Sequence, residues 1–130
     1  MKSYERREKV ARAIQKELGA FIQKGGIKDD RLSQFVSIVE VSLNSSLSSA
    51  RVSFSIFSSA DEASKEVERI STQAALNDNS GFLRGIVGRR LNLKYAPRLF
   101  FQASDSLSKA VDMVDWIDKI VEEDQSHHEE

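Results

Sequence analysis

Apolar residues recur with helical spacing in the first part of the chain. Between Tyr4 and Lys24 they form one stripe, made of Val10, Ile14, Leu18, Phe21 and Ile22. Such a stripe lies along one face of a helix and predicts that this face packs on a core. Gly25 and Gly26 follow, and glycine adopts the left-handed turn that ends a helix at little steric cost.

Two strand-like runs come next. Residues 35–43 are rich in β-branched side chains, which predicts a strand buried over much of both faces. Residues 51–57 alternate, with Val52, Phe54 and Ile56 on one face and polar side chains on the other. A polar, serine-rich turn at 44–49 separates the runs, so we expect an antiparallel hairpin.

A second helical pattern is interrupted near its middle. Ser59 and Glu62 have the spacing of a capping box, and the helix they open carries Ala63, Val67, Ile70 and Ala74 on one face. The pattern breaks at residues 77–81, whose side chains favour caps and turns, and resumes at Phe82, Leu83, Ile86, Val87 and Leu91. We therefore predict a kinked helix pair, with Asn79, Ser80 and Gly81 at the kink. Gly81 is expected there because it takes a backbone shape that side chains resist, or because it lets a binding partner approach closely.

The chain closes with a strand and a further helix. Pro97 stops any helix, and residues 99–101 predict a third short strand. Ser104 or Ser106 can cap a last helix with an apolar side, made of Leu107, Val111, Val114 and Val121, and acidic residues at 112, 115 and 118. The expectation is a single domain over residues 4–121 and an acidic, disordered tail over 122–130.

Composition argues against several functional classes. There is no cysteine, which excludes disulfides and fits a reducing cytoplasm. No apolar run reaches the roughly 20 residues of a membrane span, and the first ten residues do not resemble a signal peptide. Only His127 and His128 could act as imidazole ligands or bases, and their place in the tail makes them incidental. With no phosphate-binding loop, nucleophile elbow or metal-ligand spacing, we expect no enzyme, cofactor, metal site or small-molecule substrate, and a cytoplasmic location.

Charge is unevenly distributed although the net charge is only −1. Residues 1–28 hold eight basic and three acidic side chains, and residues 81–104 hold five basic and none acidic. Residues 105–130 hold nine acidic and two basic side chains. The two basic blocks can bind a polyanion if folding brings them together, and are merely solvated helix faces if it does not.

The break at residues 77–81 is the most informative local feature. The string Gly85-Ile86-Val87-Gly88 has the letters of the backbone clamp of KH domains, but Ile86 and Val87 continue an apolar stripe, which favours a helix. A kinked junction instead presents free backbone N–H groups at a helix N-terminus, where anions bind. Arginines follow directly, and arginine suits bidentate phosphate contact.

Several local strings, in order and spacing, resemble the ribosome-binding factor A family. They are Arg6-Arg7 with Val10 and Ile14, the string at 29–32, Val39-Glu40-Val41-Ser42, Ala50-Arg51-Val52, residues 77–84, and residues 91–107 around Pro97. The chain departs from the family where Asp30 replaces a proline, where Asn79-Ser80-Gly81 replaces Ala-x-Gly, and where Arg98 replaces a common glutamate.

The resemblance implies an α+β, KH-like domain of type II, with a three-stranded sheet packed against helices and a kinked helix pair in place of the GxxG loop. It implies a monomeric factor that binds the free 30S ribosomal subunit and assists late maturation of the 5′ end of 16S rRNA, with no membrane partner. The basic residues expected to contact RNA are Arg84, Arg89, Arg90, Lys94 and Arg98, with Arg6, Arg7 and Arg12 as a second patch. Two alternatives stay open: a KH-like module for another RNA, and a protein-interaction module that uses the acidic last helix.

Overall fold

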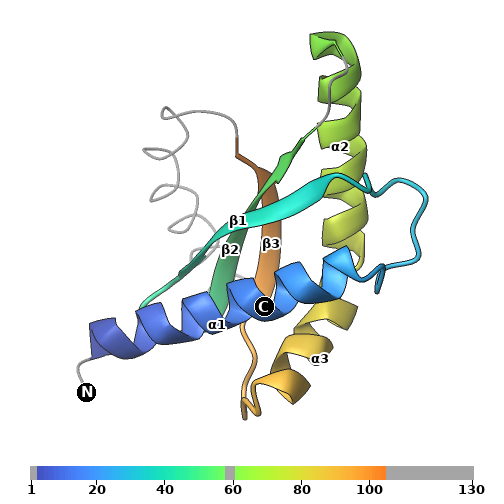
Figure 1. Ribbon diagram of the computed structural model, residues 1–130. Helices are drawn as coiled ribbons and strands as arrows, with labels where there is room; N and C mark the ends of the chain where they lie inside the picture. The colour runs from blue at the N-terminus through green and yellow to red at the C-terminus, as the bar shows by residue number, and fades with distance from the viewer. Residues whose placement is uncertain (1–2, 58–60, 105–130) are drawn as a thin grey trace, which may run out of the picture.

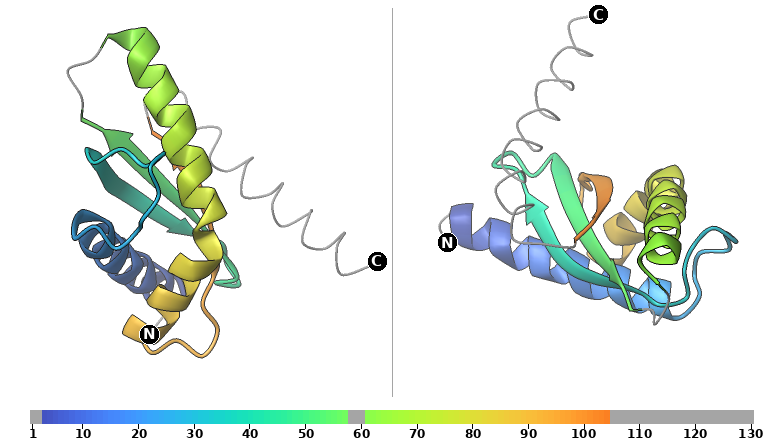
Figure 2. Two further views of the ribbon diagram at one scale, coloured as in Figure 1. Left: turned by 90° about the vertical axis from the view of Figure 1, so that its right-hand side faces the viewer. Right: turned by 90° about the horizontal axis from the view of Figure 1, so that it is seen from above.

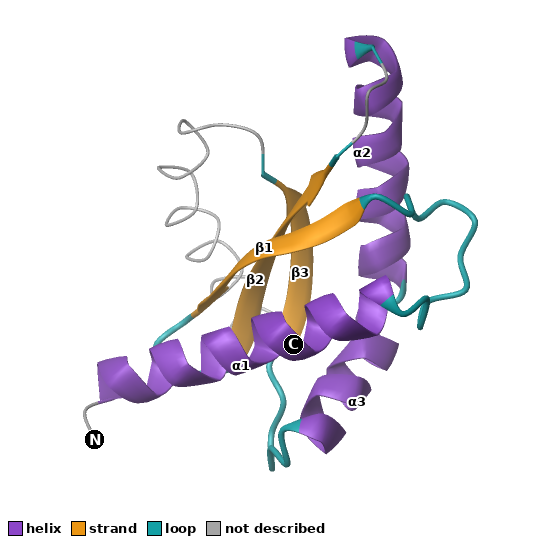
Figure 3. Ribbon diagram, viewed as in Figure 1, coloured by secondary structure: helices purple, strands orange, loops and turns teal. Residues whose placement is uncertain are grey.

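The computed structural model describes residues 3–57 and 61–104 (Figure 1). Its elements are α1 (Ser3–Gln23), β1 (Val36–Leu43), β2 (Ser49–Ile56), α2 (Glu62–Asp78), α3 (Ser80–Arg90) and β3 (Arg98–Ala103). This order confirms the predicted helix, hairpin, helix pair and third strand (Figure 3). The predicted last helix, the end of the domain at residue 121 and the tail at 122–130 lie outside the described residues.

The three strands form one mixed sheet in the order β1-β2-β3. β1 and β2 are antiparallel, as a hairpin requires, whereas β2 and β3 are parallel. Parallel neighbours need a long crossover connection, and α2 with α3 supplies it. α1 crosses one face of the sheet, while α2 and α3 lie on the side of β3 (Figure 2). This arrangement is the predicted α+β, KH-like fold.

The core lies between α1, α3 and the inner face of the sheet. The strand register stacks inward side chains on one another: Ile38 pairs with Phe54, and Val52 pairs with both Val41 and Phe101. The helices add buried side chains, namely Ile14, Leu18, Ile22, Leu76, Leu83 and Val87. Burial of this apolar surface is the main stabilising term, at about 25 cal/mol per Å² removed from water.

β1 is buried on one face only, which corrects the expectation of burial on both. A bulge between Ile38 and Glu40 shifts the register by one residue. The extra residue brings Val41 back to the inner face and leaves Val39 exposed at the bulge. In β2 the apolar residues face the core at alternate positions as predicted, but Arg51 and Ser53 between them are also buried, each 2% exposed. On its outer face, Arg51 donates hydrogen bonds from Nε and Nη2 to Oε1 of Gln102 on β3, at 3.0 and 2.8 Å.

α1 ends as the sequence predicts, because Gly25 has a φ of +76°. α2 begins differently. Its N-cap is Asp61, whose side chain accepts a hydrogen bond from the Ser64 backbone N–H at 2.8 Å. Ser59, the predicted cap, lies outside the described residues.

The apolar stripe predicted along α2 faces solvent. Val67 is 66% exposed and Ile70 is 63% exposed, whereas Thr72, Ala75 and Leu76 are fully buried. The reason lies in β3, an edge strand whose free backbone groups need polar partners. Polar residues of α2 therefore occupy the position beside the sheet.

Two amide side chains of α2 hydrogen-bond to the backbone along this edge of β3. Asn77 Oδ1 accepts from the Phe101 backbone N–H at 2.8 Å, and Asn77 Nδ2 donates to the Phe101 carbonyl at 3.0 Å. One turn earlier, Gln73 Oε1 accepts from the Ala103 N–H at 3.1 Å. These side chains replace the neighbouring strand that β3 lacks, and they fix α2 against the sheet.

The helix pair breaks at Asn79, as predicted, with Asn79 serving as the C-cap of α2 and the N-cap of α3. Ser80 and Gly81 already belong to α3. The conformational role expected of Gly81 is wrong: its φ is not positive, and a Cβ added there would meet no atom within 4 Å. The change of direction is made by the backbone of Asn79, at φ −97° and ψ 8°.

Candidate nucleic-acid interface

α3 is held to the body of the protein by buried apolar side chains and carries three exposed arginines. Leu83 and Val87, one turn apart, are fully buried in the core. Arg84, Arg89 and Arg90 are exposed. Gly85 and Gly88 lie inside this helix, so the GxxG letters form no loop here, as the sequence indicated.

The loop after α3 turns back along the helix and enters β3. Asn92 takes a left-handed conformation, with φ 54°, and the Leu93 N–H donates to the Gly88 carbonyl at 2.9 Å. Arg84 Nε donates to the Ala96 carbonyl at 2.9 Å and so joins the first turn of α3 to the end of the loop.

Tyr95 is the residue of this surface that sequence reasoning missed. Its ring is 80% exposed, and Lys94 Nζ lies 5.5 Å from the ring centroid. An exposed aromatic ring flanked by cations is the usual platform for stacking an unpaired base. The available signal was an aromatic residue inside a basic block that fits no apolar stripe.

Arg90 has a second role, because it joins α3 to α1. Arg90 Nη1 lies 3.4 Å from Glu17 Oε2, and its guanidinium lies 5.3 Å from the centre of the Phe21 ring. Phe21 also contacts Phe82 of α3, with ring centres 5.8 Å apart. Part of the Arg90 charge is therefore balanced within the protein.

The two predicted basic patches do not merge into one surface. Arg84, Arg89, Arg90, Lys94 and Arg98 are exposed and belong to α3, its following loop and the start of β3. We call this set the α3 surface. The N-terminal half of α1, which carries Arg6 and Arg7, points away from α3 (Figures 1 and 2).

The α1 patch is itself divided. Arg7 and Arg12 line a hollow of about 470 Å³ between α1 and β1, together with Gln15 and Glu40. Arg12 Nη1 also lies 3.6 Å from Glu8 Oε2. Carboxylates thus accompany this patch, whereas the segment 81–104 contains none.

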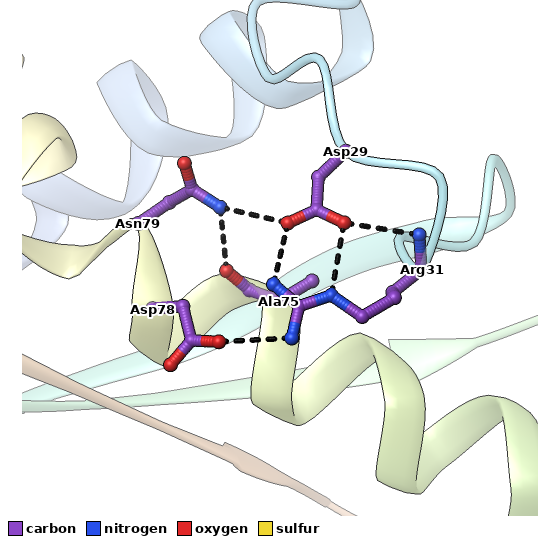
Figure 4. A network of polar contacts seen from close by, with 5 residues as sticks. All are labelled: Asp29, Arg31, Ala75, Asp78 and Asn79. Atoms are coloured by element: carbon purple, nitrogen blue, oxygen red, sulfur yellow. Dashed lines mark hydrogen bonds and ion pairs between the residues drawn. The ribbon is translucent and has the colours of Figure 1, made fainter.

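A polar network fixes the α2–α3 junction to the loop that precedes β1 (Figure 4). Asp29 holds the Arg31 guanidinium with both oxygens, at 3.0 Å from Nε and 2.7 Å from Nη2. Arg31 Nη1 reaches Asp78 Oδ2 at 2.8 Å, and Asn79 Nδ2 donates to Asp29 Oδ2 at 3.2 Å and to the Ala75 carbonyl at 2.7 Å. We call Asp29, Arg31 and Asn79 the junction brace.

The brace places charges where phosphate was expected to bind. Hydrogen bonds from Arg31 hold the pKa of Asp29 well below its usual range, so its carboxylate stays ionised. Hydrogen bonds to Asp29 and then Asp78 raise the pKa of Arg31. Two carboxylates beside the junction oppose a phosphate there, and the single Arg31 cation offsets only one of them.

Other kinds of site find no support in residues 3–57 and 61–104. No group of three or more His, Asp or Glu side chains in these ranges could hold a metal ion. None of the helices described there is long and apolar enough to cross a membrane.

The fold and the α3 surface define a KH-like domain in which a kinked helix pair stands where other KH domains carry a GxxG loop. Residues 6–117 match the family model of ribosome-binding factor A. Ribosome-binding factor A of Magnetococcus marinus is 39% identical over 97 residues, which are 75% of this chain and 73% of that protein. The chain belongs to the ribosome-binding factor A family.

Solved structures agree on the fold. The crystal structure of ribosome-binding factor A from Thermus thermophilus is 22% identical and superposes with a TM-score of 0.57, covering 75% of this chain and 94% of that one. A homology model of the Thermus thermophilus factor, fitted into a cryo-EM map of a 30S–ribosome-binding factor A complex, gives a TM-score of 0.51 at 23% identity. It covers 69% of this chain and 86% of that one.

Proposed function

We propose that this protein binds the free 30S ribosomal subunit in the cytoplasm and assists late maturation of the 5′ end of 16S rRNA. It acts as a monomer and without covalent chemistry. Membership of the family and the 30S complex of the Thermus thermophilus relative support this function. The observation that supports it is the α3 surface, whose five exposed cations and exposed Tyr95 ring belong to a segment of sequence free of acidic residues.

The residues of this surface would have two different roles, phosphate contact and base stacking. Arg89 and Lys94 are exposed and would contact phosphates, which position a protein on RNA. Tyr95 would stack on an unpaired base and so favour a locally open rRNA conformation. Binding that prefers one rRNA conformation shifts the population toward it, and this shift is how a non-catalytic factor assists maturation.

Sedimentation tests the proposal. The protein is expected to travel with free 30S subunits in a lysate gradient, rather than with 50S or 70S particles. Cells that lack it should accumulate precursor 16S rRNA with an unprocessed 5′ end. Co-sedimentation only with transfer or messenger RNA fractions would favour a KH-like module for another RNA and would overturn the 30S assignment.

A matched pair of double variants tests the surface. Arg89→Ala with Lys94→Ala, and Arg6→Ala with Arg12→Ala, each remove two exposed positive charges. Each lost phosphate contact lowers the slope of log affinity against log salt by about 0.7–0.9, so the first pair should lower the slope of 30S binding by about 1.4–1.8. The second pair should lower it by less, and equal slopes for the two pairs would contradict the assignment to the α3 surface.

A further inference from the structure

α2 is anchored to β3 and α3 to the core, but few contacts within the junction itself set the angle between the two helices. Helical hydrogen bonding reaches Asn79 from both sides, since its N–H donates to the Ala75 carbonyl at 3.1 Å and its carbonyl accepts from the Leu83 N–H at 3.0 Å. The kink itself is one residue wide, and Gly81 beside it is neither strained nor crowded. The junction brace supplies contacts from outside the helix pair, across a sequence separation of 47 to 50 residues.

The charges of the brace match the polarity of the two helix ends. Arg31 lies beside Asp78 at the C-terminus of α2, where a cation is favourable. The Asp29 carboxylate is bonded to the N-cap residue of α3, and an anion is favourable at a helix N-terminus. A single Asp–Arg pair therefore stabilises both helix ends when they meet at this angle.

We propose that Asp29, Arg31 and Asn79 are positioning residues for RNA binding. They hold the angle between α2 and α3 and so place the α3 surface relative to the sheet. The brace occupies the place where KH domains clamp the nucleic-acid backbone with a loop, and it contacts no RNA itself. This inference rests on the proposed function for its RNA partner, but the angle can be measured without RNA.

A matched pair of substitutions separates a positioning role of Asp29 from the simple effect of removing one negative charge. Asp29→Asn and Asp30→Asn each remove one negative charge at neighbouring positions, and the exposed Asp30 lies outside the brace. If the junction bound phosphate, both changes would strengthen binding, because each removes repulsion. If Asp29 is a positioning residue, Asp29→Asn weakens 30S binding, by roughly 2- to 30-fold as is usual for residues that act through others, and Asp30→Asn does not. In Asp29→Asn the slope of log affinity against log salt should stay unchanged, because the phosphate contacts in the bound state are the same.

The angle is measured by spin labels on the free protein. The chain has no cysteine, so Ala63→Cys on α2 and Arg89→Cys on α3 give two labelling sites that are both exposed. Asp29→Asn in this background should broaden or shift the distance distribution, and Asp30→Asn should leave it unchanged. If Asp29→Asn fails to fold, Arg31→Lys is the milder variant, because lysine keeps the charge but lacks the planar fork that spans two carboxylates.

The outcomes distinguish the two proposals. An unchanged distance distribution in Asp29→Asn, with Arg31→Lys also unchanged, overturns the brace whatever the binding result. A broadened distribution with 30S binding equal to that of Asp30→Asn keeps the brace as a structural device but overturns its positioning role, while RNA contact by the α3 surface is tested separately by the two double variants.

Discussion

The α3 surface and the N-terminal half of α1 have similar local sequences and different structural settings. Both are basic helical segments with an apolar stripe. α3 is only 11 residues long, yet it is fixed by the buried side chains of Leu83 and Val87, by Arg90 against α1, and by Arg84 against the following loop. The first half of α1 extends past the sheet (Figure 1), and two of its arginines, Arg7 and Arg12, line one hollow together with Glu40.

A basic block becomes a candidate site only when it is held in place beside complementary groups. Binding of a polyanion requires cations that stay close together, and ordering them costs conformational entropy unless the fold has already done so. The fold anchors the α3 surface and adds Tyr95 to it, with one carboxylate, Glu17, against Arg90, whereas the α1 patch is shared with Glu8 and Glu40.

Removing the anchor of α3 should have the largest effect on stability. It should also abolish the difference between the α3 surface, which is held in place, and the N-terminal half of α1. Leu83→Ala deletes a fully buried side chain and should lower the free energy of unfolding by about 2–5 kcal/mol, measured by urea denaturation. Phe82→Ala is the control on the neighbouring position. Phe82 is half exposed and contacts Phe21, so it should cost only about 1 kcal/mol. Equal losses would mean that Leu83 does not anchor the helix.

Removing the ring of Tyr95 tests the contribution of base stacking to the α3 surface and leaves the charges of that surface unchanged. Tyr95→Ala should weaken binding to 30S subunits by about 1–3 kcal/mol, the value of one base–aromatic stack, and Tyr95→Phe should bind like the parent. Phe57→Ala removes another exposed aromatic residue, 69% exposed against 80% for Tyr95, at the other end of the sheet, and should leave affinity unchanged. Fluorescence anisotropy or filter binding at fixed salt gives these constants. A loss for Phe57→Ala as large as that for Tyr95→Ala would place the binding surface elsewhere.

The smallest expected effect is on the pH dependence of stability. Acid should destabilise the folded protein by protonating Asp29 of the junction brace. A carboxyl group whose pKa is lowered in the folded state adds stability above its unfolded pKa, about 3.9, and loses it as pH falls toward the lower folded value. Melting temperatures measured from pH 5 down to pH 2 should therefore fall less steeply in Asp29→Asn than in the parent. Arg31→Gln should also flatten the curve, because it removes the main cause of the shift. Parallel curves for all three proteins would show that the ion pair adds no net stability.

The elements of this fold follow from local sequence. Apolar spacing, the glycines after α1, the alternation in β2 and Pro97 each constrain a few neighbouring residues, and the described elements match their predicted positions closely. The kink was also predictable, because Asn, Asp and Ser weaken a helix wherever they gather. Leu83 and Val87 could be assigned to the core from the stripe that they continue.

Tertiary structure decided which faces are buried and which charged residues meet. The apolar stripe of α2 lies in solvent because Gln73 and Asn77 are needed at the edge of β3, and that edge exists only after β3 has paired with β2. Arg31 lies 47 residues from Asp78 along the chain, so no periodicity relates them. Local sequence fixes elements because helix and turn energetics act between near neighbours. Long-range contacts also depend on how those elements pack, and packing alone separated the α1 patch from the α3 surface.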